Sequence, residues 1–278
     1  MQLPDSVEEW NRIAAEFYHM WNFPNCIGAI DGKLVHIQRP VRCGATYFNY
    51  KRSFSVNMMA VIDARYRFLY VAVGAQGSAN DAAVFNASRF AEKIADSSNP
   101  LCIPAARPIP GTGHQTPLLF VADDAYPLRP YIMKPFSSRG LCASERIFNY
   151  RLSRARRVVE NSFGILVNRF RIFRTTIQMQ PEKVTGIVLA ACALHNYLRS
   201  RSLQADDDDT EVRCDDNNVE AQHNLTIAHV SHQPRAKGCH YNAHAKSIRD
   251  TLAAHFVSQG QVYWQWKYAN VSCDTTAD

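Results

Sequence analysis

Four acidic residues stand inside short segments of largely apolar or small residues. They are Asp31 after Ile27-Gly28-Ala29-Ile30, Asp81 after Gly77-Ser78-Ala79-Asn80, Asp123 after Leu119-Phe120-Val121-Ala122, and Glu160 after Arg157-Val158-Val159. An ionised carboxylate in an apolar setting is costly unless a cation or hydrogen-bond donors compensate its charge. Because the chain repeats this arrangement, we expect the four side chains to be metal ligands.

The order of three of these acids indicates which reaction a metal would serve. Phosphodiester cleavage needs an activated oxygen nucleophile and stabilisation of the charged transition state and the leaving oxygen. Two Mg²⁺ or Mn²⁺ ions about 3.5–4 Å apart supply all three, and Mg²⁺ takes oxygen ligands. Asp31 and Asp123 near strand ends, with Glu160 on a later helix, reproduce the Asp-Asp-Glu order of ribonuclease H-like nucleases. The pattern predicts a divalent-metal-dependent nuclease, with two ions expected.

Structural roles for the same acids remain open alternatives. Asp81 follows Ser78 by three residues, which is the spacing of a helix capping box, and a cap and a metal ligand are equally compatible with it. Asp31 precedes a glycine and could belong to a turn. Glu160 could be the i,i+4 ion-pair partner of Arg156 on a helix surface. The apolar residues before Asp31 favour a ligand there, whereas only its company with Asp31 and Asp123 favours Glu160 as a ligand.

Arginine is concentrated around Glu160. The formal charge is +6 overall, but residues 1–200 contain 24 Lys and Arg against 14 Asp and Glu, whereas residues 201–278 contain 7 against 11. Such a run of charged residues usually forms a solvent-exposed helix face. Guanidinium groups beside a carboxylate site also match backbone phosphates, and the residues expected to contact the DNA backbone are Arg151, Arg154, Arg156 and Arg157.

Length and composition restrict the class of protein. A chain of 278 residues with 46% hydrophobic and 20% charged residues can bury one sizeable core, so we expect one catalytic domain with appendages. No apolar run approaches the roughly 18 residues of a membrane span, and the N-terminus lacks signal-peptide order. The eight cysteines contain no C-x-x-C pair, which argues against a disulfide framework and a zinc finger.

The periodicity of apolar residues predicts helices and strands that alternate along the chain. We expect strands at 26–30 and 34–37, joined or separate, a hairpin of 53–62 and 67–73, and a strand at 118–121. Helices are expected at 7–20, within 79–94, at 144–173 (continuous or interrupted), at 182–199 and at 246–257, with a loop at 97–115 and a terminal strand or hairpin at 261–271. This order indicates a layered α/β fold.

Four regions follow from this organisation. Residues 1–25 form a helical lead-in, 26–200 the catalytic domain, 201–222 an acidic flexible linker, and 223–278 a tail with a helix and an aromatic strand containing Trp264 and Trp266. His195 lies on an apolar helix and is expected to be a core histidine. The histidines of the tail match no standard zinc spacing, so a flexible polar segment is expected there.

Six segments together resemble the Harbinger-type transposases and the nucleases derived from them. They are FPNCIGAIDGK at 23–33, GSANDAAVF at 77–85, DDAYPL at 123–128, FNYRLSRAR at 148–156, VENSFG at 159–164 and LHN at 194–196. Each segment alone is weakly specific, but all six occur in the order of the family, and the resemblance runs from about residue 10 to residue 200.

The resemblance implies a DDE endonuclease domain with a ribonuclease H-like mixed sheet and flanking helices. It implies that Asp31, Asp123 and Glu160 are the catalytic residues and that Asp81 is a further metal ligand. It selects Asp123 over Asp124, since the acid of the family lies three residues before the aromatic Tyr126. It also implies DNA as substrate, a Myb-like DNA-binding partner protein that supplies targeting, and localisation to the nucleus, with the cytoplasm as a further compartment.

The chain departs from the family pattern in two places. Many relatives have histidine where this chain has Leu34, and His36, on the same strand face, is a candidate substitute. Relatives also have an N-terminal helix-turn-helix region, so targeting is expected from a partner unless the chain is a fragment. The predicted function is a metal-dependent DNA endonuclease. The alternative is a domesticated, non-catalytic DNA- or chromatin-binding protein that retains the fold.

Overall fold

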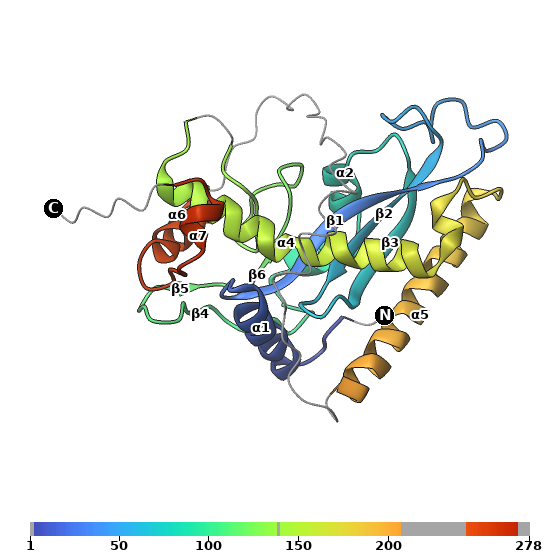
Figure 1. Cartoon of the computed structure of the whole chain (residues 1–278). Coiled ribbons are helices and arrows are strands. Elements are labelled where there is room, and N and C mark those ends of the chain that lie inside the picture. The colour runs from blue at the N-terminus through green and yellow to red at the C-terminus, as the bar shows by residue number, and fades with distance from the viewer. Residues whose placement is uncertain (1–2, 138–139, 207–242, 272–278) are drawn as a thin grey trace.

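A computed structural model describes residues 3–137, 140–206 and 243–271 (Figure 1). The elements in chain order are α1 (Val7–Trp21), β1 (Cys26–His36), β2 (Ser55–Ile62), β3 (Phe68–Gln76), α2 (Asp81–Asn86), α3 (Arg89–Ala95), β4 (Arg107–Pro108), β5 (Gln115–Thr116), β6 (Leu119–Val121), β7 (Ile132–Met133), α4 (Ala143–Arg169), the 3₁₀ helix η1 (Arg171–Arg174), α5 (Pro181–Asp206), α6 (Ala243–Phe256) and α7 (Gln265–Tyr268).

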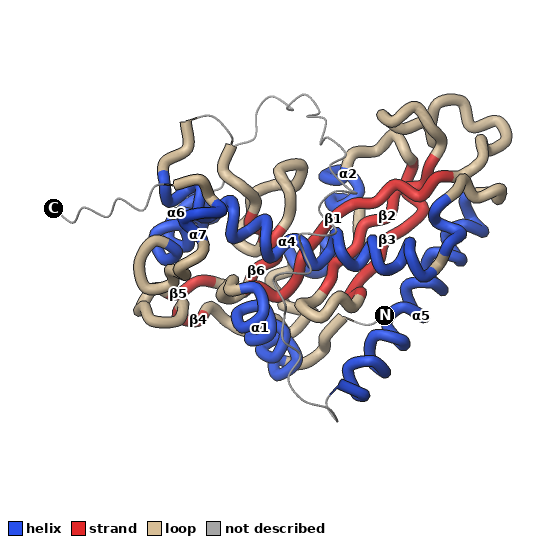
Figure 2. Tube along the Cα trace, in the orientation of Figure 1, coloured by secondary structure: helices blue, strands red, loops and turns tan. Residues whose placement is uncertain are grey.

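The core is a five-stranded mixed sheet in the order β3-β2-β1-β6-β7 (Figure 2). The pairs β1–β2 and β2–β3 are antiparallel, whereas β1–β6 and β6–β7 are parallel. Every residue of the interior strand β2 is buried, as expected for a strand covered on both faces. The mixed sheet with flanking helices confirms the predicted ribonuclease H-like α/β class.

β1 extends well beyond the end of β6. The second half of β1 is therefore unpaired on the β6 side, and we call this the open end of the sheet. The β1–β6 ladder runs from Cys26 opposite Leu119 to Ala29 opposite Val121, where β6 ends. β1 continues to His36 along β2. Residues that follow Val121 therefore leave the ladder beside the middle of β1.

The two faces of β1 meet different helices because successive side chains point to opposite faces. Gly28 faces the side of Phe120, whose ring would lie 2.8 Å from a Cβ at position 28. Trp10 of α1 and Phe90 of α3 pack edge-on against the same Phe120 ring. Lys33 faces the other side, where its Nζ lies 5.7 Å from the ring centroid of Phe163 on α4.

The predicted elements in the first 200 residues are confirmed, with corrections at their ends. The two expected strand pieces at 26–37 form the single strand β1, and the loop at 97–115 includes β4 and the start of β5. The long helix is unbroken over α4 and is followed by η1. α5 continues to Asp206, so the first residues of the predicted acidic linker are helical.

The expected strand at 261–271 is wrong, because the described chain forms the short helix α7 there. Alternating aromatics suggested a strand, but Gln265 between them is fully buried and donates from Nε2 to the Phe256 carbonyl at 2.7 Å. The remainder of the linker and the tail up to residue 242 lie outside the described residues, with His223, His229, His232 and His240. No helix in the described ranges is long and apolar enough to cross a membrane.

Candidate active site

Asp31 and Asp123 lie side by side where β6 ends. Ala29 is the last residue of β1 paired with β6, opposite Val121, so Asp31 and Asp123 follow their paired residues by the same two positions. Oδ1 of Asp31 accepts from the Gly32 amide at 2.8 Å, and Oδ1 of Asp123 accepts from the Ala125 amide at 3.0 Å. Both side chains are only partly exposed. The open end of the sheet thus carries two neighbouring carboxylates.

Asp81 reaches this position from α2, on the face of β1 opposite to α4. Its carboxylate lies against Gly32, so close that any Cβ at position 32 would overlap it. The absence of a side chain at Gly32 is therefore what admits Asp81. The predicted capping role of Asp81 is wrong: Asn80 is the N-cap, with its side chain accepting from the Ala83 amide at 2.8 Å, and Asp81 is the first helical residue.

Burial and mutual repulsion make ionisation of these carboxyl groups unfavourable. Burial, then the neighbouring Asp123 and Asp81, raise the pKa of Asp31 to about 7. Burial and Asp123 raise the pKa of Asp81 to about 6, and burial also raises the pKa of Asp123. Three acids that repel one another when ionised gain strongly from a nearby cation.

Arg156 of α4 supplies such a cation within the protein. Its guanidinium lies 3.8 Å from Oδ2 of Asp31 and donates to Oε1 of Glu160 at 2.6 Å. The same charge opposes the rise in pKa at both Asp31 and Asp123. The i,i+4 pair of Arg156 with Glu160 therefore exists, and it joins Glu160 to the aspartates instead of being a separate surface pair.

Asp124 is directed away from the group. Its side chain is 56% exposed and pairs with Nζ of Lys134 at 3.1 Å. Tyr126, three residues beyond Asp123, is buried under the acids, and burial with the nearby carboxylates raises its pKa well above the ordinary value. Its hydroxyl has no hydrogen-bond partner within the described chain. Sequence reasoning used Tyr126 only to fix the register of Asp123 and missed its place beneath the site.

The four carboxylates are suitable ligands for a divalent cation by chemical type, but their positions do not form a ready metal site. Asp31, Asp81, Asp123 and Glu160 offer the carboxylate oxygens that Mg²⁺ and Mn²⁺ prefer. No group of three or more acidic, histidine or cysteine side chains in the described residues is already drawn together as a metal site. The guanidinium of Arg156 lies between Asp31 and Glu160, so binding of an ion by both would require this side chain to move.

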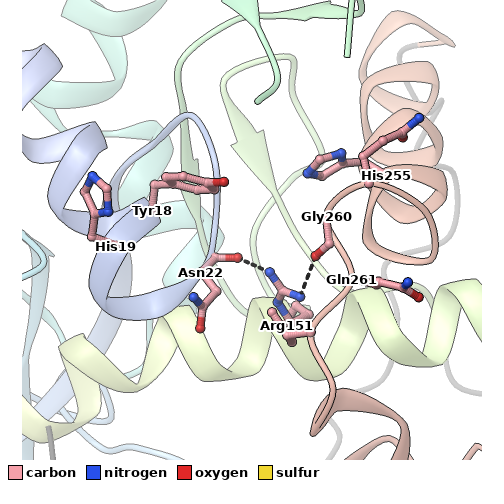
Figure 3. A pocket seen from close by; sticks show the side chains of 9 residues that line it. Tyr18, His19, Asn22, Arg151, His255, Gly260 and Gln261 are labelled. Atoms are coloured by element: carbon pink, nitrogen blue, oxygen red, sulfur yellow. Dashed lines mark hydrogen bonds between the residues drawn. The ribbon is translucent and has the colours of Figure 1, made fainter. Parts of the chain in front are cut away.

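The arginines expected on the DNA backbone divide into different environments. Arg151 is 2% exposed. It donates to the carbonyls of Asn22 and Gly260 (Figure 3) and to Oε1 of Gln265 at 2.8 Å. It lines a pocket of about 220 Å³ that none of the four acids reaches. The structure therefore does not place Arg151 where a phosphate could contact it, contrary to expectation.

The other three arginines remain near the surface of α4. The guanidinium of Arg154 lies 4.5 Å from the ring centroid of Trp264, Arg156 is engaged with the carboxylates, and Arg157 is half-buried. Arg151 and Arg157 are six positions apart on α4, about 9 Å along the helix axis, so the two ends of this basic segment have different neighbours. Arg154 and Arg157 stay the candidates for phosphate contact.

His195 and His36, the two histidines weighed as site candidates, have structural partners. His195 is buried, its Nε2 lies 2.8 Å from the Tyr66 carbonyl oxygen, and its ring packs edge-on against Phe68, which confirms the expected core histidine. Nδ1 of His36 lies 3.0 Å from Oγ of Ser53. Burial and the neighbouring lysines lower the pKa of His36. Its ring is thus bound to the segment before β2, at the last residue of β1, five positions beyond Asp31.

Comparison with known proteins adds to this geometry. The family described as DDE superfamily endonuclease matches residues 30–196. The chain is 26% identical over 262 residues to "Protein ALP1-like" of Arabidopsis thaliana, covering 90% of this chain and 57% of that protein. It is 30% identical over 191 residues to "Putative nuclease HARBI1" of Xenopus laevis, covering 68% and 50%.

The human protein of the latter name is 28% identical over 184 residues, covering 65% of this chain and 48% of its own length. The chain thus spans about half the length of the curated relatives it matches. No solved structure matches it significantly. The family match includes Asp31, Asp81, Asp123 and Glu160 and covers more than half of the chain. With its mixed sheet and its acids at the open end of β6, the chain belongs to the DDE superfamily endonuclease family.

Proposed function

We propose that the protein is a divalent-metal-dependent DNA endonuclease derived from a Harbinger-type transposase. The observation that carries the proposal is that Asp31, Asp81 and Asp123 lie around the end of β6, near enough for their charges to interact, with raised pKa values at all three. Acids held together against their mutual repulsion are characteristic of a site that binds cations. A structural role explains such a cluster poorly, because carboxylates so placed reduce stability unless a cation is bound.

The residues would divide the work of cleavage between them. Asp31 on β1 and Asp123, two residues beyond the end of β6, would bind the metal jointly, with Asp81 contributing from the α2 side and Glu160 from α4. Bound Mg²⁺ or Mn²⁺ supplies an activated water and stabilises the charge on the scissile phosphate. Arg156, once released from Glu160, would be free to donate to a phosphate oxygen, because guanidinium and phosphate are geometrically matched.

DNA is proposed as the substrate because of the charge distribution and the family. The excess of basic residues lies in residues 1–200, the region that contains the acids, and Arg154 and Arg157 lie on the same helix as Glu160. We further propose that the protein is located in the nucleus and that a Myb-like DNA-binding partner directs it to its DNA target. Co-precipitation with such a partner and fluorescence localisation in cells would test both parts.

Plasmid nicking tests the activity directly. The chain should nick supercoiled DNA with Mg²⁺ or Mn²⁺ and stop when EDTA is added. Glu160→Gln and Asp123→Asn should each reduce the rate by at least about 10³-fold, whereas Asp124→Asn, the matched control, should keep most of it. Equal losses in Asp123→Asn and Asp124→Asn would show that the assigned position is wrong.

A non-catalytic DNA- or chromatin-binding role is the second candidate, and the Arg156–Glu160 pair at 2.6 Å favours it. A guanidinium fixed in the site would replace the metal permanently. In that case DNA binding would persist without cleavage at any Mg²⁺ or Mn²⁺ concentration, and Glu160→Gln would leave binding unchanged.

A further inference from the structure

The outward face of α5 is apolar and exposed. The helix packs on β3 through buried residues that include Val184, Val188, Cys192 and His195. Its other face exposes Gly186, Leu189, Ala190, Ala193, Leu194 and Tyr197. Leu194 is 52% exposed and Tyr197 58%. Contiguous apolar side chains on a surface usually mark a place of contact with another molecule.

These residues form one continuous stripe along the helix. Positions 186, 190, 193 and 197 recur at intervals of four, three and four residues, which places them on one line of an α-helix. Leu189 and Leu194 border this line on opposite sides. Exposed charges of opposite sign stand at the two ends, Glu182 at the first turn and Arg201 beyond Tyr197. They are roughly 28 Å apart at 1.5 Å per residue.

The residues of the stripe are arranged in matching pairs about its midpoint. Its midpoint lies between Ala191 and Cys192, and each residue has a counterpart at the same distance on the other side. Leu189 corresponds to Leu194, Ala190 to Ala193, Gly186 to Tyr197 and Glu182 to Arg201. Each pair is therefore alike, complementary in size, or opposite in charge.

We propose that a second copy of this chain docks on this stripe, with the two α5 helices antiparallel about a two-fold axis. A two-fold interface brings each residue against its counterpart in the other copy. Ala190 and Ala193 at the crossing point allow close approach of the helices. The Tyr197 ring covers the space left by Gly186, and Leu189 packs on Leu194.

The end charges select the antiparallel orientation. Glu182 of each copy meets Arg201 of the other, giving two ion pairs, while the parallel orientation would place Glu182 against Glu182 and Arg201 against Arg201. Arg201 is held in the stripe, since its guanidinium lies 5.9 Å from the Tyr197 ring centroid. The chain's own acidic segment at 206–216 is a poorer candidate to cover the stripe, because an apolar surface offers few cations to its aspartates.

Sedimentation velocity on the full chain tests the proposal. One helix pair makes a small interface, so we expect a reversible dimer with a dissociation constant on the order of 10–100 μM. Leu194→Asp should leave a monomer throughout this range. Val41→Asp, at an apolar residue that is 77% exposed elsewhere, is the matched control and should dimerise like the wild type. Circular dichroism verifies that both variants fold.

A charge exchange tests the geometry independently. Glu182→Arg and Arg201→Glu should each weaken dimerisation by about tenfold, because each creates two like-charge contacts. The double variant should restore it to within about threefold of wild type. A wild-type chain that stays monomeric at 200 μM, as when the acidic segment or another protein covers the stripe, overturns the proposal. Single variants that weaken the dimer without restoration in the double variant overturn the antiparallel pairing.

Discussion

Arg156 is the residue on which the state of the carboxylate group depends. Its guanidinium contacts both Asp31 and Glu160. It lowers the cost of keeping Asp31 and Asp123 ionised, which is also what a bound metal ion would do. A protein cation and a metal ion therefore compete for the same oxygens.

Arg156→Gln should strengthen binding of Mn²⁺ and weaken cleavage. Removal of a positive charge next to the ligands should increase Mn²⁺ affinity by about tenfold at pH 8, as measured by isothermal titration calorimetry. The rate should fall because no guanidinium is left to donate to phosphate. Arg157→Gln, one residue along the helix, is the control and should leave Mn²⁺ affinity unchanged. Unaltered affinity in Arg156→Gln would show that the arginine does not compete with metal.

Asp31 makes the stability of the metal-free protein depend on pH. Its folded pKa of about 7 lies above its ordinary value of 3.8, so the folded state holds a proton that the unfolded state has lost. Stability should therefore be greatest below about pH 4 as far as this group is concerned, and should decline as pH rises toward 7.

Asp31→Asn should remove this decline. In EDTA at pH 8 the variant should be more stable than wild type by about 1–3 kcal/mol, measured by urea unfolding, while at pH 4 the two should be nearly equal. Mn²⁺ should stabilise the wild type and have little effect on the variant. A variant that is less stable than wild type at pH 8 would contradict the burial of an ionised carboxylate at this position.

At the scale of elements, the contact of α2 with β1 depends on Gly32. Asp81 begins α2 and lies directly against the backbone of β1. Gly32→Ala should force α2 away and reduce nicking by at least about tenfold, with a loss of roughly 1–3 kcal/mol in stability. Gly164→Ala on α4 is the control, because a Cβ there meets nothing within 4 Å. It should stabilise the protein by up to about 1 kcal/mol.

The elements that sequence predicts well are those with a regular apolar pattern. β2 and β3 and the long α4 follow from periodicity alone, and the order of Asp31, Asp123 and Glu160 indicated a nuclease before any geometry was known. α7 could not be predicted, because alternation of Trp264 and Trp266 fits a strand equally well. Its helical form depends on a buried Gln265 bound to distant residues.

The same limit applies to Arg151. The four arginines between positions 151 and 157 of α4 look equivalent in sequence, and only the fold distinguishes them. The partners of Arg151 are 109 and 114 residues later in the chain, at Gly260 and Gln265. No local pattern indicates contacts across such distances, so a role on the DNA surface was the natural expectation for a residue that is in fact interior.

At the scale of the whole molecule, the C-terminal helices are part of the main core although the family match ends at residue 196. Phe256 of α6 packs against Phe23 and Phe148. Arg151 lies 4.4 Å from the Phe256 ring centroid. A single buried guanidinium thus connects the end of α1, the middle of α4 and the segment between α6 and α7.

Arg151→Met should therefore loosen the C-terminal helices while leaving the acids in place. The substitution keeps much of the side-chain volume but leaves the carbonyl oxygens of Asn22 and Gly260 and Oε1 of Gln265 without their donor, which should cost about 3–5 kcal/mol. The rate of amide hydrogen exchange should increase much more in α6 and α7 than in β1 and β2. Arg157→Met, half-buried on the same helix, should change stability by no more than about 0.5 kcal/mol. If exchange in Arg151→Met rises uniformly across the chain, α6 and α7 unfold only together with the sheet, and Arg151 stabilises the protein as a whole instead of attaching its C-terminal part.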